Sequence, residues 1–311
     1  MRGPTAIQGA FRPPRRDNGV VARVPGTGEV TVRDGTRLRT VEWSSPSDSP
    51  GARIVLVHGL ASNARLWDGA ARELARRGHA VTAIDLRGHG LSDKPDAGYS
   101  VHEVADDVRD AIVALHGSAR VIAIGQSWGG NLVVELAARH AGHLRGVVAV
   151  DGGTIDLARA FPDWDECRRT LSPPNLEGMS YDRLRSYIRA AHPDWSDEGI
   201  DGQMANMEHR ADGTIKPWLT LERHLLILRG LWEHSPSALW PRIEVPVLFT
   251  PAAKSDDDHV RAKRRQLGDA LATLPRARVE WFEPADHDLH AQFPDRFASV
   301  VDDAIATGFF A

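Results

Sequence analysis

The sequence predicts an α/β fold in which helices cover both faces of a doubly wound, mostly parallel sheet. Three observations predict it: short apolar runs alternate with helix-length amphipathic segments, the runs are apolar without interruption, and the alternation stops once before it resumes. Uninterrupted apolar runs are typical of parallel strands, because helices on both faces of the sheet bury them completely. The repeated strand–helix order therefore indicates a doubly wound sheet.

The first part of the predicted sheet begins with a hairpin and continues with alternating strands and helices. Strand-like residues at 29–32 and 37–43 flank Asp34-Gly35, a pair typical of a hairpin turn. Four apolar runs then predict strands at 53–58, 80–85, 120–125 and 146–151. The amphipathic segments between them predict helices at 64–77, 101–115 and 129–141.

An insertion interrupts this pattern. Residues 154–242 show no convincing strand run, and prolines divide them into short helices. The pattern then resumes with a strand at 243–250, a helix at 257–274, a strand at 278–282 and a helix at 294–306. We therefore expect a core of residues 25–153 and 243–311 with a helical insertion at 154–242. The insertion holds five of the nine tryptophans: Trp164, Trp195, Trp218, Trp232 and Trp240.

The composition excludes several classes of protein. Apolar residues make up 42% and charged residues 26%, with a mean hydropathy of -0.33, which excludes a disordered chain and a coiled coil. The net charge of -4 gives no basic excess that would indicate nucleic-acid binding. The single cysteine, Cys167, excludes an intramolecular disulfide and a Cys-rich zinc site.

No segment of the sequence suggests a membrane or an export route. No run approaches the roughly 18 apolar residues of a membrane span. Residues 1–24 carry five arginines and one acid without an apolar run, so we expect a flexible N-terminal arm and no secretory signal. A cytoplasmic location is the resulting default expectation.

The most informative motif is Gly125-Gln126-Ser127-Trp128-Gly129, which fits G-x-S-x-G between a predicted strand and a predicted helix. A serine hydroxyl is a poor nucleophile in water, so it needs a nearby base and an exposed position. A sharp strand-to-helix turn exposes it, and small residues two before and two after it avoid clashes in that turn. We expect Ser127 to be a nucleophile; the alternative is a helix-capping serine in a tight turn.

An oxyanion hole is expected from two backbone N–H groups. One is that of Trp128, the residue after the nucleophile, and the other lies in the loop His58-Gly59-Leu60 after the strand at 54–57. Leu60 is the expected donor in that loop, and Gly59 permits the close approach. We expect His58 to support the loop and not to be catalytic.

The expected general base is His287, the first histidine after the last predicted strand. Bases that serve an exposed serine lie on loops at the carboxyl edge of the sheet, where the serine is also displayed. His290 lies one helical turn further along and is expected to start the last helix. The two histidines with their neighbouring aspartates match a metal site only weakly, because no third ligand is obvious, so no metal is expected.

Two positions compete for the carboxylate that orients the base. Asp151 ends a predicted strand, 24 residues after Ser127, and is followed by two glycines. Asp256 opens a run of three acids after the next strand, a pattern typical of a solvated helix start. A catalytic carboxylate is expected to be partly buried and alone, so Asp151 is favoured and Asp256 remains the alternative.

These motifs and their order resemble the α/β-hydrolase superfamily, in particular its capped esterase-like and C–C-hydrolase-like branch. The resemblance covers about residues 29–308 and rests on four segments: His58-Gly59, Asp85-Leu-Arg-Gly-His-Gly-Leu-Ser-Asp93, Gly125–Gly129, and His287 with Pro294. It implies an eight-stranded, mostly parallel sheet, a helical cap at 154–242 after the sixth strand, and a serine triad that needs no cofactor.

The sequence departs from the family pattern at the seventh strand. Family members often carry Gly-x-x-Asp there, whereas this chain has Pro251-Ala-Ala-Lys-Ser255. The acid position after the sixth strand, as in haloalkane dehalogenases, matches Asp151. Those dehalogenases and the epoxide hydrolases use an aspartate nucleophile, so Ser127 argues against both activities.

The expected function is hydrolysis of a carboxylic ester or lactone of a small hydrophobic substrate through Ser127, His287 and Asp151. The alternatives are a C–C bond hydrolase or a biosynthetic cyclase with the same triad and, more remotely, a ligand-binding receptor without turnover. Tryptophans and methionines of the cap are expected to form mainly the cap's own core and in part an apolar pocket. Neither the natural substrate nor the oligomeric state is encoded in these patterns.

Overall fold

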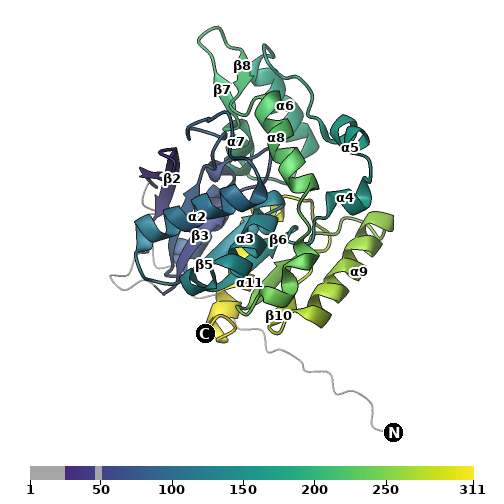
Figure 1. Cartoon of the computed structure of the whole chain (residues 1–311). Coiled ribbons are helices and arrows are strands. Elements are labelled where there is room, and N and C mark those ends of the chain that lie inside the picture. The colour runs from purple at the N-terminus through teal and green to yellow at the C-terminus, as the bar shows by residue number, and fades with distance from the viewer. Residues whose placement is uncertain (1–24, 46–50) are drawn as a thin grey trace.

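The computed structural model describes residues 25–45 and 51–311, so the expected arm at 1–24 lies outside the described residues. The chain forms an eight-stranded sheet with strand order β1-β2-β4-β3-β5-β6-β9-β10 (Figure 1). All its neighbouring pairs are parallel except β1–β2 and β2–β4. The strands are β1 (Gly26–Thr31), β2 (Arg37–Trp43), β3 (Arg53–Val57), β4 (Ala80–Ile84), β5 (Val121–Gln126), β6 (Leu144–Val150), β9 (Val247–Thr250) and β10 (Ala277–Val279). The predicted fold class is confirmed.

Helices cover both faces of this sheet, and each face has its own apolar core. One core holds Val55 and Val57 of β3 together with side chains of α2 (Val101–His116), α3 (Trp128–Arg139) and α9 (Asp258–Thr273). The other holds Ile54 and Leu56 together with side chains of α1 (Asp68–Arg76) and α11 (Pro294–Ala306). This burial on both faces is the reason for the uninterrupted apolar runs in the sequence. The helices of the sheet region are η1 (Ala64–Trp67), α1 (Asp68–Arg76), α2 (Val101–His116), α3 (Trp128–Arg139), η2 (Ala141–His143), α9 (Asp258–Thr273), α10 (Leu289–Gln292) and α11 (Pro294–Ala306).

The segment between β6 and β9 is mostly helical and projects above the sheet in Figure 1. It also contains an antiparallel hairpin, β7–β8, which the sequence pattern did not predict because each strand has three residues, too few to show a period. Its elements are α4 (Leu157–Ala160), α5 (Trp164–Leu171), α6 (Tyr181–Ala191), α7 (Asp197–Met204), β7 (Met207–His209), β8 (Ile215–Pro217), α8 (Leu221–Trp232), η3 (Pro236–Ala238) and η4 (Trp240–Arg242).

Two glycines bring this inserted segment close to the sheet region. A Cβ on Gly202 of α7 would lie 2.7 Å from the carbonyl oxygen of Arg65 in η1, and one on Gly230 of α8 would lie 2.9 Å from that of Tyr99. The segment also has a small core of its own, in which Met204 is buried with Leu184 and Ile215 while other side chains, including Met179 and Met207, pack against them. These three methionines therefore pack within the inserted segment.

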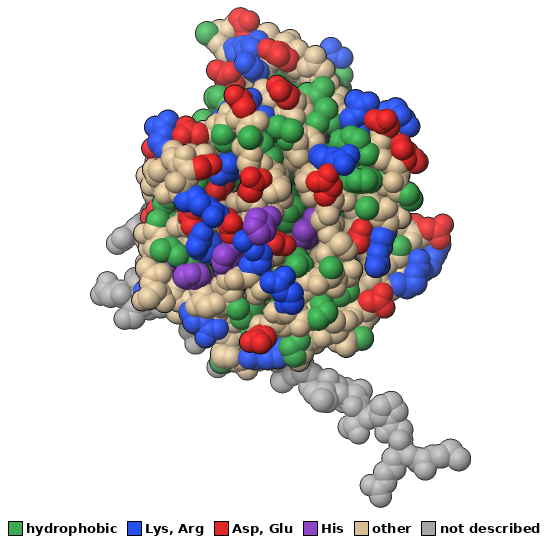
Figure 2. Space-filling model, in the orientation of Figure 1, with side chains coloured by type: hydrophobic (Ala, Val, Ile, Leu, Met, Phe, Trp, Pro, Cys, Tyr) green, Lys and Arg blue, Asp and Glu red, His purple; other side chains and the backbone are tan. Residues whose placement is uncertain are grey.

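The surface carries charges of both signs. On the face shown in Figure 2, Lys and Arg side chains are interspersed with Asp and Glu, and several histidines gather over α2 and α3. Among the described residues, no helix has the length and apolar character needed to cross a membrane.

Candidate active site

Ser127 lies on a strained turn between β5 and α3. Its backbone has φ 54° and ψ -118°, a conformation that side-chain-bearing residues seldom adopt and that structures often retain at functional sites. The turn is tightly packed: a Cβ on Gly125 would lie 1.9 Å from the carbonyl oxygen of Gly129, and one on Gly129 would lie 2.5 Å from that of Val57. Only glycine fits at these two positions. The Ser127 side chain is partly exposed, and its Oγ makes no hydrogen bond within the described ranges.

His287 and Asp151 form a hydrogen-bonded pair next to this turn. His287 Nδ1 lies 2.6 Å from Asp151 Oδ2, across 136 residues of sequence. Because the carboxylate accepts from Nδ1, the second ring nitrogen, Nε2, is left able to accept a proton. The Gln126 side-chain amide lies 3.5 Å from the His287 carbonyl oxygen, and a Cβ on Gly152 would meet the Ser127 carbonyl oxygen at 2.2 Å. The structure therefore brings His287 and Asp151 into contact at the sheet edge that carries the turn of Ser127.

The environment of this pair shifts both pKa values. Burial acts to raise the pKa of Asp151, but the hydrogen bond from His287 and the charges of His287 and Lys263 outweigh it, so the pKa lies below its ordinary value. Partial burial acts to lower the pKa of His287, but the hydrogen bond and charge of Asp151 raise it above its ordinary value. The Asp151 side chain is 6% exposed and that of His287 is 52% exposed, so the acid is sheltered while the base meets solvent.

The alternative acid, Asp256, lies elsewhere. Its side chain is 76% exposed and its carboxylate faces Arg261 at 3.8 Å. The next residue, Asp257, accepts a 2.9 Å hydrogen bond from the Val260 N–H and caps α9. The run of three acids therefore forms a solvated helix start, as its sequence pattern indicates. The carboxylate that contacts His287 is that of Asp151 and not that of Asp256.

The two expected oxyanion donors belong to segments next to Ser127: Trp128 follows it in the chain, and the loop of Leu60 packs against it. Trp128 is the first residue of α3, where backbone N–H groups lack helical partners. A Cβ on Gly59 would lie 3.2 Å from Ser127 Cβ, so the loop that carries Leu60 runs directly against the serine. Within the described residues, neither the Leu60 nor the Trp128 N–H donates to a protein acceptor.

A buried histidine pair supports the Leu60 loop. His58 Nε2 accepts from the Leu86 N–H at 3.0 Å, so its Nδ1 donates to the Gly59 carbonyl at 2.7 Å. Burial and the neighbouring His89 lower the pKa of His58 to about 3, which keeps it neutral. His89 Nε2 lies 2.6 Å from the Leu60 carbonyl oxygen. His58 thus has the structural role that the sequence suggests, and His89 is a further support that sequence reasoning did not single out.

The remaining histidine of the C-terminal motif lies in the core. His290 does not start the last helix, which begins at Pro294; it lies in the preceding short helix α10. It is 1% exposed, and its ring packs tilted against Trp67 with 4.0 Å between ring centroids. Burial lowers its pKa to about 3. Over residues 25–45 and 51–311, no three His, Cys, Asp or Glu side chains are grouped so as to hold a metal ion.

A mostly apolar cavity of about 290 Å³ opens beside Asp151 and His287. Its walls come from β6, β9, α4 and α9, and Ser127 is not among the residues that line it. Its apolar lining includes Ala149, Ile155, Ala160, Phe249, Pro251 and Leu267. Lys263 also lines this cavity and contacts Asp151; no sequence pattern indicated it, because a lysine on an amphipathic helix is usually solvated.

Comparison with known proteins agrees with this architecture. Residues 52–198 match the family model described as alpha/beta hydrolase fold. The chain is 37% identical over 251 residues to a 2-(acetamidomethylene)succinate hydrolase of Mesorhizobium japonicum, covering 79% of this chain and 84% of that protein. It is 38% identical over 275 residues to a non-heme chloroperoxidase of Streptomyces lividans, covering 86% of this chain and 95% of that protein. The crystal structure of an E-2-(acetamidomethylene)succinate hydrolase superposes with a TM-score of 0.75 at 22% identity, over 91% of this chain and 99% of that one.

Proposed function

This chain belongs to the α/β-hydrolase superfamily, and from that premise we propose that it is a serine hydrolase that cleaves a carboxylic ester or lactone without a cofactor. The observation that carries the proposal is the 2.6 Å pair of His287 and Asp151 beside the strained turn at Ser127. An imidazole oriented by a buried carboxylate, next to a partly exposed serine, is the arrangement that nucleophilic acyl transfer requires.

In the proposed mechanism, His287 Nε2 takes the proton of the Ser127 hydroxyl as Oγ attacks the carbonyl carbon. Asp151 stabilises the imidazolium that forms, and the N–H groups of Leu60 and Trp128 bind the oxyanion of the tetrahedral intermediate. The imidazolium gives its proton to the departing alcohol, which leaves an acyl-enzyme on Ser127. Water, activated by His287, then releases the acid and restores the serine.

We infer that the substrate is small and largely hydrophobic. The cavity that adjoins His287 and Asp151, although Ser127 is not part of its wall, has mostly apolar walls and a volume of about 290 Å³. This volume is close to the lower limit of typical small-molecule sites, roughly 300 Å³. Residues 154–242 would form the cap over this region, which agrees with the close packing of α7 on η1 and of α8 on the start of α2.

The test is the rate of hydrolysis of p-nitrophenyl acetate and butyrate by the wild type and the Ser127→Ala variant. The variant should lose turnover completely while keeping its circular dichroism spectrum and melting temperature. A fluorophosphonate probe should label the wild type and not the variant, which also separates an enzyme from a receptor that does not turn over substrate. Retained ester hydrolysis by Ser127→Ala would overturn the proposal.

A second candidate substrate is an acetamido-substituted dicarboxylic acid. The relative that supports it, 37% identical over 79% of this chain, is named for the hydrolysis of 2-(acetamidomethylene)succinate. Ser127 Oγ would attack the acetamido carbonyl carbon, with His287 as the base and the same two N–H groups binding the oxyanion. Assaying that compound beside the p-nitrophenyl esters at equal enzyme concentration decides between the two, because the preferred substrate should have the higher kcat/KM.

A further inference from the structure

The acid of the proposed triad has a second charged partner, Lys263 of α9. Its Nζ lies 2.5 Å from Asp151 Oδ1 and 2.8 Å from the carbonyl oxygen of Ala252. The Lys263 side chain is 14% exposed and the Asp151 side chain is 6% exposed, so the ion pair is largely shielded from water. An ion pair with this geometry interacts far more strongly than one on the surface.

The two carboxylate oxygens of Asp151 have different partners. Oδ2 accepts from His287 Nδ1 at 2.6 Å, whereas Oδ1 accepts from Lys263 and from the Ala252 N–H, which lies at 2.9 Å. Lys263 and the backbone therefore fix the rotation of the carboxylate with the second oxygen directed at His287. This rotation determines the orientation of the imidazole.

We propose that Lys263 is a positioning residue of the triad: it holds the Asp151 carboxylate in its working orientation and offsets part of its charge, so that His287 stays a neutral base at lower pH. The inference rests on the proposed serine-hydrolase function. A cation beside Asp151 weakens the negative field at the imidazole, which favours the neutral form. In agreement, the charge of Lys263 acts to lower the pKa of His287, against the raising effect of Asp151.

Other ionisable groups also face this pair, and they stay in place when Lys263 is changed. They are Asp288 in the same loop, His290 on α10, and His259 on α9, which lines the same cavity. Asp286, the residue before His287, is paired with Lys254 and His192. A difference in the pKa of His287 between the wild type and a Lys263 variant therefore reports on Lys263.

The experiment measures the pKa of His287 directly, by NMR titration of protein carrying ¹³C-labelled histidine, with the signal assigned from its absence in His287→Gln. Lys263→Met should raise this pKa by about half a unit to one unit, and Lys263→Arg, which keeps the charge, should restore the wild-type value. The acid limb of the kcat/KM profile for p-nitrophenyl acetate should shift upward in parallel. A purely structural role would lower the plateau of that profile without moving its limb.

Arg261→Met is the matched control, because it removes a cation from the same helix. Arg261 pairs with Asp258 at 2.7 Å, outside the triad, so the His287 pKa should stay at the wild-type value. If Lys263→Met does not fold, Lys263→Gln, which removes the charge but keeps a donor, should give the same upward shift. An unchanged His287 pKa in the folded uncharged variant overturns the role of Lys263 alone, whereas ester hydrolysis by Ser127→Ala overturns the proposed function.

Discussion

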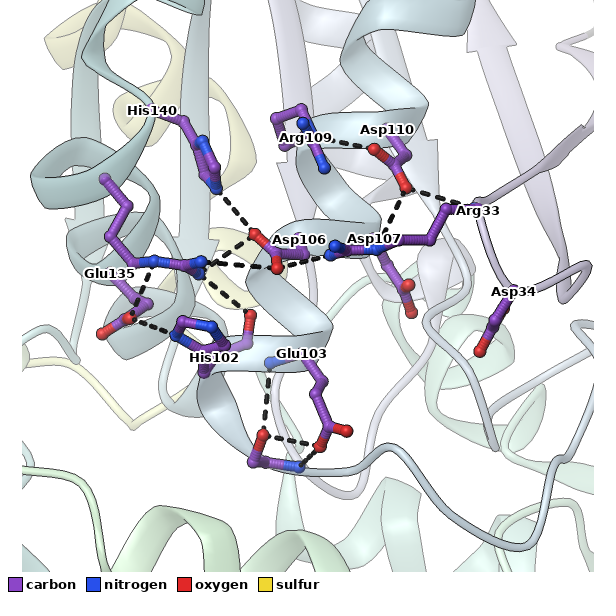
Figure 3. Close-up of polar contacts among 12 residues, drawn as sticks. Arg33, Asp34, His102, Glu103, Asp106, Asp107, Arg109, Asp110, Glu135 and His140 are labelled. Atoms are coloured by element: carbon purple, nitrogen blue, oxygen red, sulfur yellow. Dashed lines mark hydrogen bonds and ion pairs between the residues drawn. The ribbon is translucent and has the colours of Figure 1, made fainter.

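Asp151 and Asp106 are both buried carboxylates that bind a histidine and a cation, but only Asp151 lies beside a serine turn. Asp106, on α2, accepts a 2.6 Å hydrogen bond from His140 Nε2 and forms ion pairs with Arg33 and Arg139. Figure 3 shows Arg33 and His140 approaching Asp106 from two sides, with Glu135 and His102 close by. This cluster links α2 and the end of α3 to the turn of the hairpin.

The histidines of the two pairs respond in opposite ways. The pKa of His140 is lowered, because burial and the charges of Arg139 and Arg109 outweigh Asp106, whereas the pKa of His287 is raised. Asp151 also has a backbone φ of 42°, at the end of β6 and next to the serine turn. A His–carboxylate pair is therefore not by itself a sign of catalysis; its place at the carboxyl edge of a parallel sheet is the distinguishing feature.

The largest expected effect is on catalytic activity, which should fall when Asp151 is changed and not when Asp106 is changed. Asp151→Asn should lower kcat for p-nitrophenyl acetate by about 10³- to 10⁴-fold, because the amide no longer stabilises the imidazolium and favours the wrong tautomer. Asp106→Asn should leave kcat/KM within about twofold of the wild type, since it touches none of the proposed reacting groups. Equal losses in the two variants would contradict the assignment of Asp151 as the triad acid.

The next largest expected effect is on the stability of the fold, to which the Asp106 carboxylate should contribute. Asp106→Asn should lower the free energy of unfolding by about 1 to 3 kcal/mol, because it leaves Arg139 and His140 partly buried without their carboxylate. Urea unfolding followed by circular dichroism at pH 7 measures the difference. A change below about 0.5 kcal/mol, typical of surface substitutions, would show that the cluster adds little to stability.

Acidic pH should remove the contribution of the Asp106 cluster to the free energy of unfolding. Burial acts against ionisation of Asp106, but hydrogen bonds from Arg33, His140 and Arg139 hold its pKa well below the ordinary value of 3.8. The unfolded chain therefore takes up the proton first as the pH falls. The stabilisation that ionised Asp106 gives to the folded protein is complete above about pH 5. It is lost as the pH falls toward the folded-state pKa of Asp106, by at most about 1.4 kcal/mol per pH unit. The stability gap between the wild type and Asp106→Asn should narrow between pH 5 and pH 2.5.

The sequence predicts the sheet well and the site only in part. Continuous apolar runs locate the four central strands to within two residues, because burial on both faces of the sheet imposes them. The strand expected at 243–250 forms only over Val247–Thr250, and the one expected at 278–282 forms over Ala277–Val279. The hairpin β7–β8 carries no such signal in its two three-residue strands. At the site, the local motif predicts the turn at Ser127, since a strained turn needs its glycines in sequence. The contact of Lys263 with Asp151 spans 112 residues and follows from tertiary packing alone.

The smallest expected effect concerns the acid that the sequence left as an alternative. Asp151 and Asp256 both follow parallel strands at the same edge, so sequence position does not distinguish them. In the structure the Asp256 side chain is 76% exposed, and its carboxylate faces Arg261 at 3.8 Å. Asp256→Asn should therefore change kcat/KM by less than about twofold and the free energy of unfolding by less than about 0.5 kcal/mol. A loss of activity comparable to that of Asp151→Asn would instead place Asp256 in the triad. An exposed carboxylate can affect activity that strongly only if it contacts the base during turnover.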